Sequence, residues 1–123
     1  MRGLLRVALL AAAFALGTYA FGWWAVAAVG VVWGVMNPGM PRVALRAGVA
    51  AAVAWAALLA MPAVVGAPTA AFAGKLAAVM QVPVWGLLAA ELLFPGALAW
   101  SAAVVGSLAR PRTPAAGTVA APR

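Results

Sequence analysis

Long apolar stretches, separated by short groups of glycine, proline and arginine, make up most of this chain. The first stretch covers residues 4–36 and carries a single charge, Arg6. As one α-helix it would be about 50 Å long, whereas the hydrocarbon core of a bilayer is about 30 Å thick. We therefore expect it to fold back at residues 17–22, which gives two short helices over roughly residues 4–18 and 21–36.

The middle of the chain predicts a turn and a third helix. Residues 37–42, NPGMPR, are expected to turn because their two prolines lack backbone donors and the Pro-Gly pair suits type II geometry. A third helix is expected from residue 43 to residue 59 or 61. The loop after it is marked by Pro62, Gly66 and Pro68.

The last apolar stretch, residues 76–109, is also too long for one straight span, because a helix of this length would measure about 51 Å. Pro83 and Pro95 are the two positions at which it can break or bend. We expect an interfacial helix over residues 70–82, followed by one long, tilted helix over residues 84–109 that is kinked at Pro95.

Basic residues stand at the edges of the apolar stretches and predict an orientation, because cytoplasmic ends of membrane helices carry an excess of lysine and arginine. Lys75 stands apart from the other seven, which are Arg2, Arg6, Arg42, Arg46, Arg110, Arg112 and Arg123. Both termini and the 37–46 loop are therefore expected in the cytoplasm, which requires an even number of spans. We predict four. A fifth span would place three arginines on the translocated face, and a three-span form is the other alternative.

The composition indicates a membrane protein and not a soluble domain. Of the 123 residues, 68% are hydrophobic and 7% are charged, whereas a soluble domain carries roughly a quarter charged residues. A globule of this size cannot enclose apolar segments this long, so lipid must cover them. We therefore predict an all-α integral membrane protein with four transmembrane helices, placed in the lipid bilayer of a bacterial cytoplasmic (inner) membrane.

The residue types exclude several kinds of chemistry. The chain has no cysteine and no histidine, which excludes disulfides, thiol chemistry, and zinc or haem sites built on those residues. Ser101 and Ser107 have no histidine to activate them, and no phosphate loop or carboxylate pair occurs. The basic residues form no patch of the kind that binds nucleic acid. We expect no enzymatic activity, no cofactor, no metal site and no nucleic-acid partner.

The first residues of the chain could be a signal peptide, and the last ones predict a tail outside the bundle. Residues 1–20 could be a signal peptide, in which two arginines precede an apolar stretch and residues 18–20, Thr-Tyr-Ala, form a cleavage site. Cleavage would leave a mature chain that starts directly with an apolar segment, so we favour a retained first helix. We assign residues 1–109 to a single helical bundle and the proline-rich residues 110–123 to a disordered cytoplasmic tail.

Glu91, the only acidic residue, lies inside the last apolar stretch. An ionisable group inside a bilayer usually faces other protein and has a partner. Pro95 lacks the amide that would bond the Glu91 carbonyl, so one residue offers a carboxyl group and a free backbone oxygen. We expect an uncharged Glu91 that is held by a donor from Tyr19, Gln81 or a tryptophan. The other polar groups expected on this outer side are Thr18, Lys75, Trp23, Trp24 and Trp85.

Small residues at helical spacing mark faces at which helices can approach closely. Gly30 and Gly34 form a GxxxG motif in the second helix. A second group shares one face of the last helix and consists of Gly96, Ala99, Ala103 and Gly106. Three of the tryptophans, Trp23, Trp24 and Trp85, are expected to anchor helices at the membrane interface.

Two functions are compatible with this pattern. The first is a structural or accessory role, in which the bundle packs with a second copy or a larger membrane complex through its small-residue faces. The second is a small transporter or channel subunit that uses Glu91 as a proton or cation site, with a ring of such residues in an oligomer. We favour the first because few polar residues are present to line a pathway. In size and layout the chain resembles small four-helix proteins of the bacterial inner membrane, a likeness of architecture alone.

Overall fold

A computed structural model describes residues 2–109, which form five α-helices and no strand. In chain order the helices are α1 (Arg2–Phe21), α2 (Trp24–Met36), α3 (Val43–Val64), α4 (Thr69–Met80) and α5 (Val84–Ala109). Three of them, α1, α3 and α5, are long and apolar enough to cross a membrane. The prediction of an all-helical bundle compatible with a membrane is confirmed, while the tail predicted for residues 110–123 lies outside the described residues.

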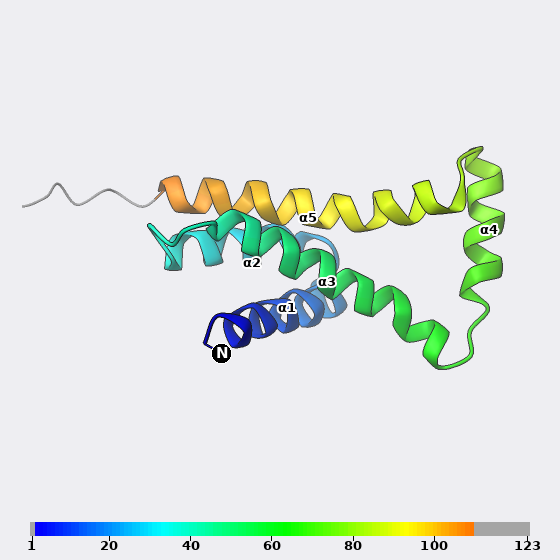
Figure 1. Cartoon of the computed structure of the whole chain (residues 1–123), viewed down its shortest axis with the longest axis horizontal. Coiled ribbons are helices and arrows are strands. Elements are labelled where there is room, and N and C mark those ends of the chain that lie inside the picture. Colours follow the sequence, from blue (N-terminus) through cyan, green and yellow to red (C-terminus); the bar gives the residue numbers. More distant parts are fainter. Residues whose placement is uncertain (1, 110–123) are drawn as a thin grey trace, which may run out of the picture.

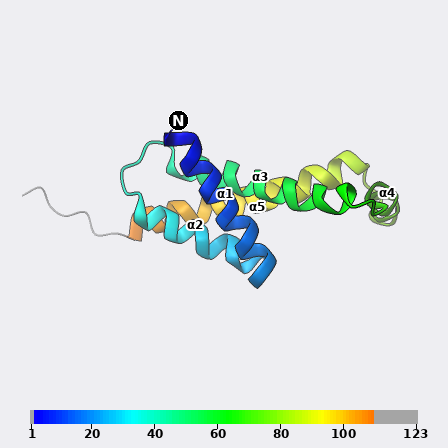
Figure 2. The ribbon, with the colours of Figure 1, turned by 90° about the horizontal axis from the view of Figure 1, so that it is seen from below.

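The helix α5 is the element against which α2 and α3 pack. From the α1–α2 turn, α2 runs in the same direction as the C-terminal half of α5, and α3 runs in the opposite direction (Figure 1). The helix α1 packs on α2 and α3 and crosses them obliquely (Figure 2). The start of α1, the 37–42 turn and the end of α5 therefore lie at one end of the molecule, and α4 lies across the other end (Figure 1).

The core between the helices consists largely of alanine, whose small side chain allows close approach of neighbouring backbones. The buried residues of this cluster are Leu10, Phe14, Val26, Ala47, Ala50, Ala51, Ala54, Ala99 and Ala103. Only a few large side chains are fully buried, among them Phe14, Val26 and Pro95. Most leucine, valine and tryptophan side chains of the described residues are instead exposed on the outside of the bundle, as expected where lipid is the solvent.

The buried side chains of α1 lead us to expect that residues 1–20 remain in the mature protein. Phe14 is fully buried and Leu10 is 5% exposed, so cleavage would open the core where α1 meets its neighbours. Losing a buried phenylalanine alone costs about 3–5 kcal/mol in a packed core. We expect the intact mass of the purified protein to include these residues. A mass that corresponds to a chain beginning at Phe21 would contradict this prediction and restore the signal-peptide alternative.

The first turn lies later in the chain than the sequence predicts. The glycines favour a break at residues 17–22, but α1 continues through Gly17 to Phe21. Gly22 ends the helix because it adopts φ +76°, a left-handed conformation that glycine tolerates, and its amide bonds the Thr18 carbonyl at 2.8 Å. Gly17 stays helical and serves packing, since a Cβ at this position would lie 3.0 Å from the Ala25 Cβ on α2.

The third helix also extends beyond its predicted end. The sequence predicts that α3 stops at residue 59 or 61, yet the helix includes Pro62 and ends at Val64. A Schellman motif stops it, in which the Ala67 amide bonds the Pro62 carbonyl at 2.9 Å and the Gly66 amide bonds the Ala63 carbonyl at 3.2 Å. Gly66, at φ +82°, supplies the left-handed residue that this motif requires. The helix ends at the glycine, and the proline two residues before its last residue is accommodated.

The helices α4 and α5 agree with their predicted positions within two residues, and α2 begins at Trp24, three residues later than predicted. The segment expected at residues 70–82 is helical over Thr69–Met80, and α5 has the predicted bounds and continues through Pro95. The helix α2 has 13 residues and is therefore about 20 Å long, less than the roughly 30 Å of a hydrocarbon core. Helix length thus identifies three candidate spans, and the fourth span and the kink at Pro95 stay predictions.

Candidate functional site

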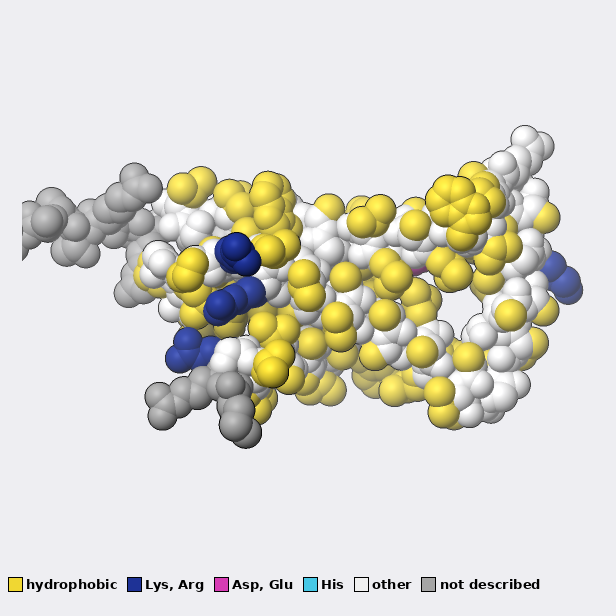
Figure 3. Space-filling view, viewed as in Figure 1, with side chains coloured by type: hydrophobic (Ala, Val, Ile, Leu, Met, Phe, Trp, Pro, Cys, Tyr) yellow, Lys and Arg dark blue, Asp and Glu magenta, His cyan; other side chains and the backbone are white. Residues whose placement is uncertain are grey.

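An apolar cavity is enclosed by α3, α4 and α5 at the end of the molecule where α4 lies. The helices α3 and α5 touch at Gly48 and Gly96, where a Cβ on Gly48 would lie 3.0 Å from the Gly96 carbonyl oxygen. Beyond this contact the two helices diverge, and α4 bridges their ends (Figure 1). The cavity between them has a volume of about 430 Å³, and its opening is visible in the space-filling view (Figure 3).

Among the described residues, Glu91 is the only charged one that lines this cavity. It follows Val84, Leu87 and Leu88 at helical spacing, so these residues share the face of α5 that borders the cavity. The other lining residues come from α3 and α4 and are apolar except for Thr69; they are Leu58, Leu59, Pro62, Thr69, Ala70, Phe72, Ala73 and Leu76. A single half-buried carboxyl group thus stands in an apolar wall.

Within residues 2–109 the Glu91 carboxyl group has no hydrogen bond and no ion pair. Pro95, one turn further along α5, is fully buried and has no amide to donate to the Glu91 carbonyl oxygen. Glu91 is only partly buried, and its oxygens are not among the fully buried, unpartnered polar atoms of the described residues, so a donor that enters the cavity can reach them. The carboxyl group is therefore a hydrogen-bonding position that the described part of this chain does not satisfy.

The structure places the expected partners of Glu91 away from the cavity. Tyr19 is 86% exposed at the end of α1, a helix that packs mainly on α2 and α3. Lys75 is exposed and does not belong to the face of α4 that lines the cavity. Gln81 is also exposed, and its left-handed backbone, at φ +55°, forms the C-terminal cap of α4.

The tryptophans and Thr18 likewise lie apart from Glu91. Trp23 and Trp24 stack at the α1–α2 turn with ring centroids 4.1 Å apart. Trp85, in the first turn of α5, is 74% exposed and does not line the cavity. Thr18 is half-buried in α1, and its hydroxyl oxygen, like the Trp55 indole nitrogen, is buried without a hydrogen-bond partner among the described residues.

The small residues at helical spacing are packed inside the bundle. A Cβ on Gly30 would lie 2.9 Å from the Ala102 Cβ and 3.0 Å from the Ala99 carbonyl oxygen. A Cβ on Gly34 would collide with the Ala103 carbonyl oxygen, and one on Gly106 with that of Val31. The helices α2 and α5 thus approach each other closely through these positions.

Gly96 packs against α3, on the other side of α5 from α2. A Cβ at this position would lie 3.3 Å from the Gly48 carbonyl oxygen on α3. Together with the α2–α5 contacts, this packing occupies the small-residue faces of α5 that the sequence offered for association. The surface available to a partner helix must therefore lie elsewhere.

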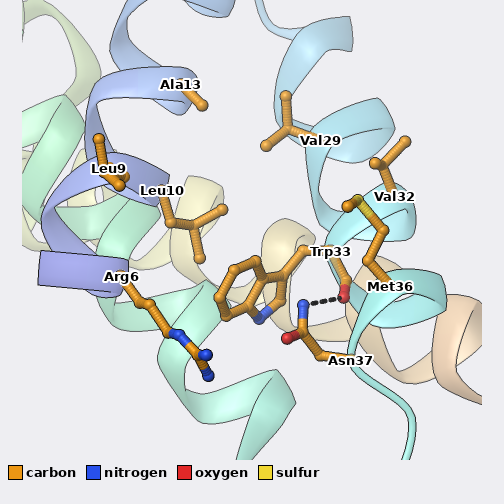
Figure 4. Close-up of a pocket in the computed structure, with 9 residues that line it drawn as sticks. All are labelled: Arg6, Leu9, Leu10, Ala13, Val29, Val32, Trp33, Met36 and Asn37. Atoms are coloured by element: carbon orange, nitrogen blue, oxygen red, sulfur yellow. Dashed lines mark hydrogen bonds between the residues drawn. The ribbon is translucent and has the colours of Figure 1, made fainter. Parts of the chain in front are cut away.

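A second hollow, not predicted from the sequence, lies between α1 and α2 near the opposite end of the molecule (Figure 4). Its volume is about 440 Å³, and Arg6 and Asn37 are the two hydrophilic residues of the described chain that line it. The predicted hairpin of the first apolar stretch could have indicated this hollow, because a turn near residue 22 brings the region of residue 6 close to that of residue 37. Asn37 is the only asparagine of the chain.

No family model, curated protein or solved structure matches this chain. Among the described residues there is also no group of three or more acidic, histidine or cysteine side chains that could hold a metal ion.

Proposed function

We propose that this protein is a non-enzymatic accessory subunit of a membrane assembly. In this proposal a helix of a second copy, or of another membrane protein, packs against the cavity enclosed by α3, α4 and α5. The observation that carries the proposal is the position of Glu91, a half-buried carboxyl group that lines an apolar opening without an internal partner. A donor on the incoming helix would satisfy it, as polar side chains commonly do between membrane helices.

The competing function is a proton or cation pathway through Glu91. Such a pathway needs polar positions on several helices, but within residues 2–109 Glu91 and Thr69 are the only polar side chains that line the cavity. Further polar positions would have to come from a ring of Glu91 residues in a homo-oligomer. The accessory role requires a single hydrogen bond across an apolar contact, and it is therefore the better match to this cavity.

Glu91 variants should change association and leave the stability of the single chain unaffected. We expect Glu91→Leu to weaken binding of the partner helix about fivefold, because one interhelical hydrogen bond in a membrane is worth roughly 1 kcal/mol. Glu91→Gln should retain most of the binding, since an amide still offers an acceptor. Energy transfer between labelled copies in vesicles measures self-association, and quantitative co-purification measures binding of another membrane protein.

A steric variant provides the matched control for this experiment. Leu76→Trp fills the cavity from α4 and keeps the carboxyl group, so it should also reduce association. Leu93→Ala changes a side chain that is 70% exposed and does not line the cavity, and it should leave association unchanged. Unaltered association in both Glu91→Leu and Leu76→Trp would exclude the cavity as the interface. Proton or cation flux in liposomes that is lost in Glu91→Gln would favour the competing function.

We further propose that the protein lies in a bacterial inner membrane with both termini and the 37–46 loop in the cytoplasm. The arginines of the described loop, Arg42 and Arg46, and the start of α1 lie at one end, whereas Lys75 lies on α4 at the other. In this arrangement α1, α2, α3 and α5 make four crossings, α4 lies in the outer interface, and α5 bends at Pro95. The α1–α2 hairpin then crosses a locally thinned bilayer, with its tryptophan pair at the outer interface.

A further inference from the structure

The hollow between α1 and α2 combines a polar end with apolar walls. Arg6 and Asn37 extend toward the same end of it, beside the indole of Trp33 (Figure 4). The remaining lining residues lie along the two helices away from that end and are apolar; they are Leu9, Leu10, Ala13, Val29, Val32 and Met36. From Arg6 to Ala13 the wall is about 10 Å long, since each helical residue rises 1.5 Å. The hollow therefore has one polar end and one apolar wall, which suits a molecule with a polar headgroup and an apolar chain.

The polar end has unused donors. Arg6 is exposed and makes no hydrogen bond or ion pair within residues 2–109. Asn37 donates one amide hydrogen to the Trp33 carbonyl at 3.0 Å, and a primary amide has a second hydrogen to donate. The Trp33 indole donates to the Val43 carbonyl at 3.3 Å, which holds the ring against the 37–42 turn. A guanidinium group and an amide group with a free hydrogen therefore line the same end of the hollow.

The charge around this end favours an anionic ligand. Basic side chains gather here in the space-filling view (Figure 3), and the chain's only acid, Glu91, lies in the cavity near α4. A zwitterionic headgroup would bring a second positive charge next to these arginines with no carboxylate to receive it. Arginine matches phosphate geometry with two parallel hydrogen bonds, and its long side chain can reach the headgroup level from a membrane helix.

We propose that this hollow binds one anionic phospholipid from the surrounding bilayer. Its phosphate accepts hydrogen bonds from Arg6 and Asn37, and one acyl chain lies between α1 and α2 along the apolar wall. The bilayer supplies this ligand laterally, because the hollow lies between two helices of the membrane bundle. The site is separate from the Glu91 cavity, so it stands independently of the proposed accessory function.

The test measures lipid binding to the full chain by native mass spectrometry in detergent. Phosphatidylglycerol and phosphatidylcholine with identical acyl chains are added separately, and inorganic phosphate is added as the headgroup alone. We expect saturable binding of one phosphatidylglycerol per chain, at least about tenfold tighter than binding of phosphatidylcholine. Arg6→Gln should weaken this binding about tenfold, because it removes the charge-assisted bonds.

Two further variants separate this site from general attraction of a basic surface. Ala13→Phe fills the apolar wall without changing charge and should also weaken binding. Arg42→Asn removes one charge at the same end, outside the hollow, and retains a residue type that tolerates the left-handed backbone seen at φ 58°. It should change binding less than about twofold, since an exposed charge contributes little.

Three results would overturn the proposal. Equal losses in Arg6→Gln and Arg42→Asn would show a diffuse surface effect. Unchanged binding in Ala13→Phe would exclude the acyl chain from the hollow. Displacement of the lipid by millimolar inorganic phosphate would show a phosphate site without a lipid-specific part. Circular dichroism of each variant confirms that the helices are retained, so a loss of binding is read only from folded protein.

Discussion

Gly34→Ala should destabilise the protein by about 1–2 kcal/mol, although the same change in an unpacked helix position stabilises a protein. Gly34 faces α5, and a Cβ there would collide with the backbone of Ala103 and lie 2.9 Å from the Ser107 amide nitrogen. Backbone atoms cannot move aside as the end of a side chain can. The added methyl group must therefore separate α2 from α5 and disturb the buried residues between them.

The matched control for this prediction is Gly74→Ala in α4. No atom lies within 4 Å of the position that a Cβ on Gly74 would occupy, so alanine there should add up to about 1 kcal/mol of helix stability. Unfolding by a denaturing detergent, followed by the helical signal, measures both variants. We expect changes of opposite sign. Gly34→Leu should have the largest effect of all, with loss of the native α2–α5 contact. Equal shifts for Gly34→Ala and Gly74→Ala would show that α2 does not pack on α5 in this way.

Single cysteines introduced at the two ends of the molecule should differ completely in their labelling by a reagent that cannot cross the membrane. The chain has no cysteine, so a membrane-impermeant maleimide labels only the introduced one. We expect Ala67→Cys, between α3 and α4, to react in intact cells, because the proposed orientation places the arginine-poor end outside. Pro41→Cys, in the 37–42 turn, should react only from the cytoplasmic side. A reporter fused after Arg112 should be active in the cytoplasm.

The accessibility of the α1–α2 turn distinguishes a protein with four membrane crossings from one with two. Phe21 is 79% exposed at this turn, and α2 is only 13 residues long. If the hairpin crosses a thinned bilayer, Phe21→Cys reacts with the reagent from outside. If the hairpin enters and leaves on the cytoplasmic side, this cysteine is shielded by lipid and the four-span proposal is wrong. Reaction of Ala67→Cys only from the cytoplasmic side would show that the orientation is the reverse of the proposed one.

Helix positions were predictable from the sequence where glycine and proline act locally. The start of α5 agrees with the prediction, because Pro83 stands just before it, where a missing amide costs no helical hydrogen bond, and the Pro83 carbonyl accepts the Leu87 amide at 3.1 Å. The end of α3 was misplaced because Pro62 is accommodated in its last turn, and the end of α1 because two kinds of glycine look alike in a sequence. Gly17 is helical and packs against α2, whereas Gly22 and Gly66 take positive φ values and end helices. Neighbouring helices distinguish these roles.

The surroundings of Glu91 were not predictable in the same way. The sequence identified this residue as the intramembrane acid and suggested donors such as Tyr19 and Gln81. The structure places Glu91 on a cavity enclosed by α3, α4 and α5, while α1 packs on α2 and α3 and carries Tyr19 away from it. The pairing of helices decides which polar groups meet, and that pairing depends on contacts between segments far apart in the chain.

The sequence by itself determined that this is an all-helical protein with apolar, membrane-compatible helices, and it located those helices and the basic ends between them. These properties are local, since they follow from hydrophobicity, from glycine and proline, and from helix length. Only the tertiary structure decided that the small residues pack inside the bundle, that Glu91 lines an open cavity, and that Arg6 and Asn37 line the same hollow. Helices that are apolar on all sides carry no stripe that identifies their buried face, so backbone packing had to select it.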